Sequence, residues 1–227
     1  MLADPRALLY PADALDPDVA ARLTAEILRG ADDGELYLQH FVSEAFVFDD
    51  GRLKTADYST DAGFGLRGVS GETTAFAHAN ELSAAAIRRA GETMRLLDPA
   101  TQAQAAPPRR TNARLYTEAN PLNAVPFADK VALCQTIDAA ARARDPRVVQ
   151  VTAVLAGSWS VVEIIRADGT RATDIRPQVR LGVNIVVEAN GRRESGHYGC
   201  GGRYLYDRVM TPESWQRAID EALKQAL

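Results

Sequence analysis

Three dipeptides suited to tight chain reversal, Asp50-Gly51, Asp168-Gly169 and Asn190-Gly191, lie between extended segments and not between helices. Asp-Gly and Asn-Gly tolerate the positive φ angles of two-residue hairpin turns, so the segments on either side of each turn pair antiparallel. From Val179 to Val187, apolar residues alternate with other residues, which is typical of a half-buried strand. No repeated helical crossovers separate the strands. The sequence therefore predicts an α+β fold with antiparallel β-sheets and flanking helices.

Four amphipathic helices are expected around these strands, over residues 16–30, 80–98, 126–145 and 211–227. Asp16, Asn80 and Thr211 carry side chains that accept hydrogen bonds from a first helical turn, and Pro126 suits the start of a helix. Three or four antiparallel strands are expected over residues 35–79. Further strands are expected at 148–155, 158–165 and 179–187, with an extended stretch after residue 169.

A polar, alanine-rich stretch from Ala100 to Thr111 is interrupted by Pro107-Pro108 and is typical of a linker. It divides the chain into two expected α+β subdomains, residues 1–105 and 106–227, each with the order helix, antiparallel strands, helix. The last helix finishes on apolar Leu227 without a glycine cap or polar tail. We therefore expect the sequence to continue into a further domain.

Glycines at Gly63, Gly65 and Gly68 match the spacing G-x-G-x-x-G of dinucleotide-binding loops. Such a loop needs a buried apolar strand before its first glycine and a helix after its last one. Polar YSTDA precedes Gly63, and the strand-like segment Thr73–Ala77 follows after a turn. The pattern is therefore read as glycines within strands, where they mark bulges or close backbone approaches.

Composition excludes several classes of protein. The net charge of -4 argues against a nucleic-acid partner, since binding to phosphates relies on clustered Lys and Arg. No apolar run reaches the ~20 residues that span a bilayer, and no signal peptide is evident, so the expected location is the cytoplasm without a membrane partner. Cys134 and Cys200 are the only cysteines and are expected to be reduced thiols.

No catalytic or metal-binding residue is expected in this chain. The histidine and cysteine side chains that could serve as metal ligands are His40, His78, His197, Cys134 and Cys200. His197-Tyr198-Gly199-Cys200 has a ligand-like spacing, but no second close pair accompanies it, and a surface histidine with a half-buried cysteine in a flexible loop is the preferred interpretation. The serine-hydrolase pattern G-x-S-x-G and the P-loop are absent from the sequence. The acidic pairs Asp32-Asp33 and Asp49-Asp50 are read as solvated turn residues.

Two glycine-rich segments are candidates for binding an extended peptide. Gly196–Tyr206 combines four glycines with Arg203 and three tyrosines, and it is either a mobile peptide-binding backbone or a tight crossing that needs glycine sterically. In Gly63–Gly71, small residues leave the main chain open to strand addition, and Arg67 supplies either a binding charge or a rim salt bridge. The candidate substrate-binding residues are Gly63, Gly65, Arg67, Gly68, Tyr198, Gly199, Gly201, Gly202 and Arg203.

Three ordered segments, residues 34–83, 121–157 and 176–206, resemble the N-terminal portion of the TldD/PmbA family of metallopeptidase subunits, on the TldD side. The resemblance implies hydrolysis of unstructured peptides by zinc-bound water, with a downstream HExxxH motif and a later cysteine ligand. This chain ends before either, so it is expected to bind no zinc and to be inactive alone. It would contribute substrate channel and dimer interface, pairing with a PmbA/TldE-type paralogue or with itself. The alternatives are a freestanding module that binds peptides by β-strand addition and, as a third hypothesis, a metal site at His197 and Cys200.

Overall fold

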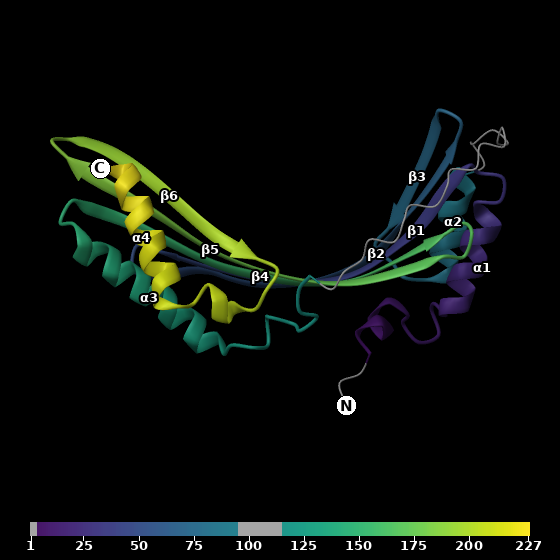
Figure 1. Cartoon of the computed structure of the whole chain (residues 1–227), viewed down its shortest axis with the longest axis horizontal. Helices are drawn as coiled ribbons and strands as arrows, with labels where there is room; N and C mark the ends of the chain where they lie inside the picture. Colours follow the sequence, from purple (N-terminus) through teal and green to yellow (C-terminus); the bar gives the residue numbers. More distant parts are fainter. Residues whose placement is uncertain (1–3, 95–114) are drawn as a thin grey trace. The chain divides into compact units, whose positions relative to one another are not determined.

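The computed structural model describes residues 4–94 and 115–227, which form an α+β fold (Figure 1). The elements are η1 (Pro5–Leu9), α1 (Pro17–Ile27), β1 (Asp33–Asp49), β2 (Arg52–Ser70), β3 (Thr73–Ala79), α2 (Ala84–Met94), α3 (Phe127–Arg144), β4 (Val148–Arg166), β5 (Arg171–Ala189), β6 (Arg192–Gly202), η2 (Tyr206–Arg208) and α4 (Pro212–Ala226). Within these residues, six strands form one antiparallel sheet in the order β3-β2-β1-β4-β5-β6. The predicted fold class is confirmed.

Each of two compact units is assembled from several stretches of the chain. Unit 1 contains the described residues of Met1–Phe41, Thr60–Ala113 and Ser160–Ile175. Unit 2 contains those of Val42–Ser59, Arg114–Trp159 and Arg176–Leu227. Strands β1, β2, β4 and β5 therefore pass from one unit into the other. The expected subdomain boundary between residues 105 and 106 lies outside the described residues and stays a prediction.

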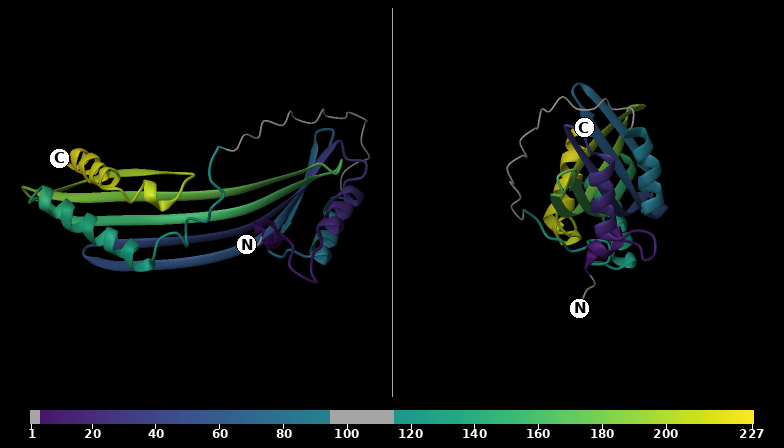
Figure 2. Two further views of the ribbon diagram at one scale, coloured as in Figure 1. Left: turned by 60° about the horizontal axis from the view of Figure 1, so that its bottom comes forward. Right: turned by 90° about the vertical axis from the view of Figure 1, so that its right-hand side faces the viewer.

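In unit 1, α1 and α2 lie side by side and bury one face of the strands (Figure 2). Asp16 caps α1 as predicted, because its carboxylate accepts hydrogen bonds from the backbone N–H groups of Asp18 and Val19 at 2.8 and 3.2 Å. At Gly91 on α2, an added Cβ would lie 2.8 Å from the side chain of Ile27 on α1, so glycine permits the close approach of the two helices. The buried side chains include Leu23, Leu36, Leu38, Leu66 and Ile87.

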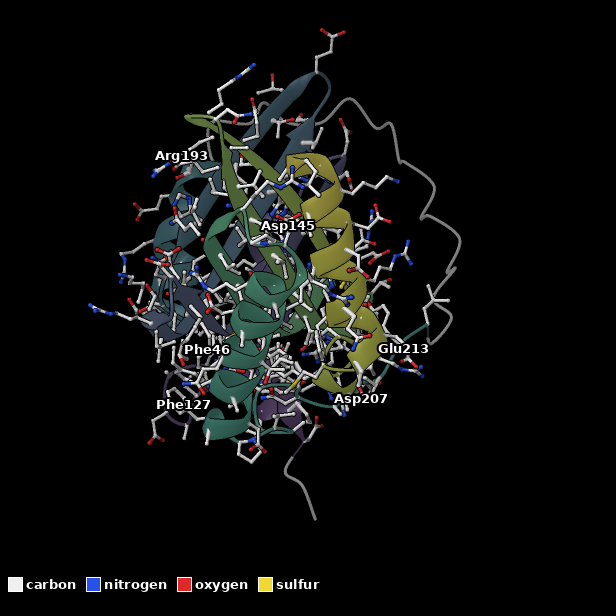
Figure 3. All side chains as sticks on the ribbon, turned by 90° about the vertical axis from the view of Figure 1, so that its left-hand side faces the viewer. Phe46, Phe127, Asp145, Arg193, Asp207 and Glu213 are labelled. Carbon is white, nitrogen blue, oxygen red and sulfur yellow. The ribbon has the colours of Figure 1, made fainter. Side chains whose placement is uncertain are left out.

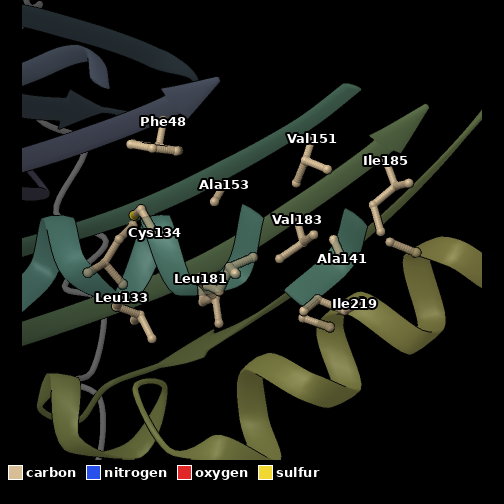
Figure 4. Close-up of a cluster of buried hydrophobic side chains, with 14 of the residues drawn as sticks. Phe48, Leu133, Cys134, Ala141, Val151, Ala153, Leu181, Val183, Ile185 and Ile219 are labelled. Carbon is tan, nitrogen blue, oxygen red and sulfur yellow. The ribbon is translucent and has the colours of Figure 1, made fainter. Parts of the chain in front are cut away.

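In unit 2, α3 and α4 cover the face that the odd-numbered residues of β4 and β5 form (Figure 4). Strand alternation places these residues on one side, and the apolar stripe of each helix packs against them. The fully buried members of this core include Cys134, Ile137, Val151, Ala153, Leu155, Leu181, Val183, Ile185 and Ile219. The even-numbered residues of both strands form the opposite face, called here the open face of unit 2.

All three expected turns are confirmed at the backbone level. Asp50 and Gly51 have φ angles of 48° and 76°, and Asn190 and Gly191 have 54° and 74°. Positive values at both central positions are the geometry for which Asp-Gly and Asn-Gly are suited. Gly169 also has a positive φ, at 81°. These turns make β1 with β2, β4 with β5, and β5 with β6 into hairpins.

Two predicted boundaries are wrong. Asn80 does not cap α2; the hydroxyl of Ser83 accepts the hydrogen bond from the N–H of Ala86 at 3.1 Å, and the helix starts at Ala84. The expected end of this helix at Asp98-Pro99 lies outside the described residues. The strands expected at 148–155 and 158–165 are one continuous strand, β4. Gly157 makes no turn there; an added Cβ would collide with the Tyr206 hydroxyl, so glycine is needed for packing.

No helix among residues 4–94 and 115–227 has both the length and the apolar character that crossing a bilayer requires.

Candidate functional site

The glycines of the G-x-G-x-x-G pattern lie on both faces of β2, inside a strand as expected. Gly68 is buried on the face that α1 and α2 cover, together with Phe64 and Leu66. Because side chains alternate along a strand, Gly63 and Gly65 lie on the opposite face. The structure therefore brings Gly63 and Gly65 together and separates Gly68 from them.

Gly63 and Gly65 form part of a groove of about 390 Å³, the unit 1 groove, whose walls include Tyr37, Phe76 and His78. At Gly63 an added Cβ would lie 2.5 Å from the carbonyl oxygen of Ala79 on β3. At Gly65 it would lie 3.3 Å from the ring of Phe76, which therefore covers the bare backbone. Phe76 remains 59% exposed and stacks on His78 with ring centroids 5.9 Å apart. An exposed aromatic wall suits an apolar side chain of an extended ligand.

Strand β3, next to this groove, is an edge of the sheet. It pairs antiparallel with β2 from Ser70↔Thr73 to Phe64↔Ala79. In the part of the chain that the structure describes, no strand pairs with its other side. An edge of this kind presents backbone N–H and C=O groups to which another extended chain can add.

Arg67, the charged candidate on β2, is held by neighbouring carboxylates. Its Nη2 lies 3.0 Å from Asp33 Oδ2, and its Nε lies 3.4 Å from Glu35 Oε1. Asp33 also accepts a hydrogen bond from Arg166 at 2.6 Å. The structure thus shows the rim salt bridge that the sequence left open as one of two interpretations, and Arg67 is not an unbalanced cation.

Residues 196–202 of the second candidate segment, Gly196–Tyr206, are not a flexible loop; they form the end of β6, which pairs with β5 from Val179↔Gly202 to Ala189↔Arg192. Tyr198 and Cys200 pack against the unit 2 core, while His197 and Gly199 lie on the open face. At Gly196 an added Cβ would collide with the carbonyl oxygen of Ala222 on α4. The steric interpretation therefore holds at Gly196, because the helix backbone crosses directly over it.

Beyond β6, Arg203 packs on Tyr116, with its guanidinium carbon 5.0 Å from the ring centroid. Its Nη1 donates a hydrogen bond to the Tyr116 hydroxyl at 3.2 Å. These side chains border a depression of about 620 Å³ that Tyr204 and Arg208 also line. Gly202 belongs to the same corner, since an added Cβ there would collide with the Tyr204 ring. Glycine is also needed for steric reasons at position 201, because a Cβ added to Gly201 would collide with the carbonyl oxygen of Val179.

The described residues do not fit a zinc site. His197 and Cys200 lie three positions apart along β6, so their side chains point to opposite faces of the sheet. Cys134 is fully buried, and burial raises the pKa of its thiol to about 11, which disfavours the thiolate that binds metal. Burial also raises the pKa of Cys200. Over residues 4–94 and 115–227, no group of three or more His, Cys, Asp or Glu side chains is placed to hold a metal ion.

A second groove, of about 450 Å³, lies in unit 2 and was not found by sequence reasoning. We call it the unit 2 groove. Its lining is mostly polar or small and comes from four strands, including Ala45 on β1, Asp57 on β2, Ser158 on β4 and Arg180 on β5. The only sequence signal for it is the alternation of small or polar residues with apolar ones, which is equally typical of an ordinary solvated sheet face.

Sequence reasoning also missed a charged cluster buried inside unit 2. Lys130 is 2% exposed, and its Nζ lies 2.5 Å from Glu44 Oε1 and donates a hydrogen bond to the carbonyl oxygen of Leu122 at 2.8 Å. The same ammonium lies 4.8 Å from the ring centroid of Tyr206 and 5.6 Å from that of Phe46. Phe46 in turn contacts Phe127 edge-on (Figure 3). Lysine on the buried stripe of α3 was not anticipated.

Two family models match most of the chain, in the order in which the resemblance places them. The PmbA/TldA metallopeptidase domain 1 matches residues 34–97, and the PmbA/TldA metallopeptidase central domain matches residues 120–227.

Curated relatives agree with this match. A metalloprotease TldD homolog from Haemophilus influenzae is 37% identical over 207 residues, covering 88% of this chain and 43% of the relative. A metalloprotease TldD homolog from Buchnera aphidicola is 34% identical over 214 residues, covering 92% of this chain and 44% of the relative. The chain thus spans less than half the length of these relatives.

Solved structures share the fold at low identity. A proposed modulator of DNA gyrase from Bacteroides thetaiotaomicron superposes with a TM-score of 0.71 at 14% identity, over 91% of this chain and 49% of the other. TldE from Thermococcus kodakarensis superposes with a TM-score of 0.66 at 14% identity, over 89% and 46% of the two chains. With two family domains in order and curated relatives above 30% identity, this chain belongs to the PmbA/TldD metallopeptidase family.

Proposed function

We propose that this chain is the part of a TldD-like metallopeptidase subunit that holds an extended, unstructured peptide and contacts a second subunit. The observation that carries the proposal is the ordered match of domain 1 and the central domain to residues 34–97 and 120–227. Zinc in the full-length subunit supplies an activated water for peptide hydrolysis. Since the described residues do not fit zinc, no hydrolytic step is assigned to them, and the chain alone is expected to cleave nothing.

The exposed edge of β3 and the unit 1 groove support the role in peptide binding. A peptide that adds to a strand edge offers its own backbone N–H and C=O groups, which only an unfolded segment has available. Gly63 and Gly65 line the groove, and the exposed ring of Phe76 offers an apolar contact. On β6 and beyond it, Tyr198, Gly199, Gly201, Gly202 and Arg203 are proposed as further substrate contacts.

The proposed partner is a PmbA/TldE-type paralogue, with self-association as the other arrangement. The fold shared with TldE from Thermococcus kodakarensis supports it, since subunits of like architecture readily form pseudo-symmetric pairs. A cytoplasmic location is part of the same proposal.

A binding and cleavage assay on the 227-residue chain tests the proposal. An unstructured fluorescent peptide should bind and remain uncleaved, whether zinc or a chelator is added. Cleavage that a chelator abolishes would contradict the proposal, and so would a complete lack of binding by both the chain and its full-length subunit.

Phe76→Ala tests the unit 1 groove directly. Removing this exposed ring should weaken peptide binding severalfold, because the apolar wall is lost, while the melting temperature stays unchanged. Tyr58→Ala is the matched control, since Tyr58 is an aromatic residue on β2 that is 65% exposed and lies outside the groove. Equal affinities of the two variants, measured by fluorescence anisotropy, would exclude this groove as the contact.

The exposed β3 edge also favours a second candidate function, a binding module that captures peptides by strand addition without any enzymatic half. The nucleotide sequence downstream of the Leu227 codon separates the two. An in-frame HExxxH motif supports the peptidase subunit, and a stop codon supports the binding module.

A further inference from the structure

Two glycines lie directly opposite each other on the open face of unit 2, Gly182 on β5 and Gly199 on β6. Arg180 precedes this pair on β5, and His197 precedes it on β6. In an antiparallel pair these two residues flank the glycines from opposite sides. Bare main chain therefore separates an arginine from a histidine on the same face of the sheet.

Both side chains lean over that bare main chain. A Cβ added at Gly199 would lie 3.5 Å from Arg180 Nη2 and 3.5 Å from His197 Nε2. A Cβ added at Gly182 would lie 3.5 Å from His197 Cε1. The Arg180 guanidinium and the His197 imidazole thus converge over Gly199 and lie close to each other on the open face.

Neither side chain is engaged by a protein carboxylate among the described residues. Arg171, on the same strand as Arg180, instead contacts Glu163 with 2.7 Å between Nε and Oε1. At His197, the backbone N–H donates a hydrogen bond to Gln225 Oε1 at 3.3 Å, which leaves the imidazole uninvolved. Arg180 and His197 therefore keep their side-chain donors available for an external acceptor.

Arg180 also lines the unit 2 groove. The groove runs from Arg180 past Ser158 on β4 and Ala45 on β1 to Asp57 on β2. Three strand spacings of ~4.8 Å make this path about 14 Å long. An extended chain advances ~3.3–3.6 Å per residue, so about four residues of peptide cover it.

We propose that Arg180 and His197 bind the C-terminal carboxylate of an extended peptide that lies in the unit 2 groove. This rests on the proposed peptide-binding function and adds the recognition of one end of the peptide. A carboxylate presents two acceptor oxygens in a plane that matches a guanidinium fork, and the imidazole can donate a further hydrogen bond. Because Gly199 has no side chain, the guanidinium and the imidazole lie close enough together for one carboxylate to accept hydrogen bonds from both. Asp57 repels a carboxylate at the other end of the groove, which favours this direction of the peptide over the reverse.

The test compares three versions of one unstructured eight-residue peptide on the 227-residue chain. They are the peptide with a free C-terminus, its C-terminal amide, and the amide with glutamate at the penultimate position. We expect amidation to weaken binding by about tenfold or more, the loss of one charge-assisted contact. Acetylation of the N-terminus of the free acid is the control and should change affinity far less.

Variants then assign the effect to these residues. Arg180→Gln should bring the affinities of acid and amide together. His197→Ala should also reduce the difference, because it removes the imidazole that donates the second hydrogen bond. Arg192→Gln, on the same strand, is the control for net charge and should keep the difference between acid and amide.

Each outcome decides the proposal. Equal binding of acid and amide by the unmodified chain overturns it and leaves the peptide-binding function intact. Full rescue of the amide by the penultimate glutamate also overturns it, since a side-chain carboxylate would then be the ligand. If no form of the peptide binds, the proposed function fails and the carboxylate site fails with it. A difference that persists in both Arg180→Gln and His197→Ala overturns the assignment to this position.

Discussion

Lys130 is the residue whose placement has the largest energetic consequence for unit 2. Removing an ammonium from water costs several kcal/mol, and this cost is offset only where close partners are provided. Glu44, the Leu122 carbonyl and the rings of Phe46 and Tyr206 surround the charge. Tyr206 is itself buried. Its burial raises the pKa of its hydroxyl, and the nearby Glu44 carboxylate raises that pKa further. The ion pair is thus a condition for burying the start of α3 against the sheet.

Breaking this pair on one side should be worse than removing both charges. We expect Glu44→Gln to lower the free energy of unfolding by about 3–5 kcal/mol, because Lys130 is left buried without a counter-ion. The double variant Glu44→Gln with Lys130→Met should regain much of that loss. Urea unfolding of the single and double variants measures this coupling. The exposed pair of Arg192 and Glu194, 3.4 Å apart, is the control and should contribute about 0–1 kcal/mol. A double variant less stable than Glu44→Gln would contradict the argument.

At the scale of elements, β6 uses glycines for different reasons on its two faces. Gly196 lies beneath the backbone of α4, whereas Gly199 lies on the open face. A backbone group cannot rotate away as a side chain can, so an added methyl group has opposite consequences at the two positions.

Gly196→Ala should therefore destabilise the chain by about 1–3 kcal/mol, because it pushes α4 off the sheet. Gly199→Ala should leave the melting temperature within a degree or two of the parent, a difference on the order of a few tenths of a kcal/mol. Thermal unfolding followed by circular dichroism compares the two variants at equal concentration. Similar melting temperatures for both would show that α4 does not hold the position over Gly196.

Sequence reasoning predicted the elements whose causes are local. Asp50-Gly51 and Asn190-Gly191 turn the chain because of their own φ preferences, and Asp16 caps α1 through atoms two and three residues away. It was wrong to break β4 at Gly157, and it left two interpretations open over the glycine-rich end of β6. A glycine signals conformational freedom and the absence of a side chain equally, and only the packed neighbours, such as Tyr206 over Gly157, decide between the two.

For the candidate site residues, too, the sequence was sufficient only where the cause is local. Gly63 and Gly65 could be proposed from the sequence, because a glycine itself indicates a position without a side chain. The joint placement of Arg180 and His197 could not, since it depends on the register between β5 and β6. Register follows from the turn and from the whole apolar pattern of the hairpin, and not from either residue.

At the scale of the whole molecule, four strands belong to both units at once. Trp159 and Trp215 both lie in unit 2, so tryptophan fluorescence reports that unit alone, while circular dichroism reports helices and strands of both. Because β1, β2, β4 and β5 continue through both units, loss of one unit removes strand length from the other.

We therefore expect a single denaturant transition, with the same midpoint by fluorescence and by circular dichroism. Leu38→Ala, in the core of unit 1, should shift the fluorescence midpoint of unit 2 as well, by the equivalent of about 2–5 kcal/mol. Asp57→Asn, an exposed change on β2, is the control and should leave both midpoints in place. Two separate transitions would mean that the units unfold independently.

The interleaving of the units along the chain also limits how this architecture can change during evolution. A gene rearrangement that exchanged one unit for another would have to cut β1, β2, β4 and β5 and rejoin all four in register. Such an event is far rarer than the exchange of consecutive domains. Relatives are therefore expected to inherit the two units as a single block and to diversify by substitution on the open faces and by changes in the hairpin turns.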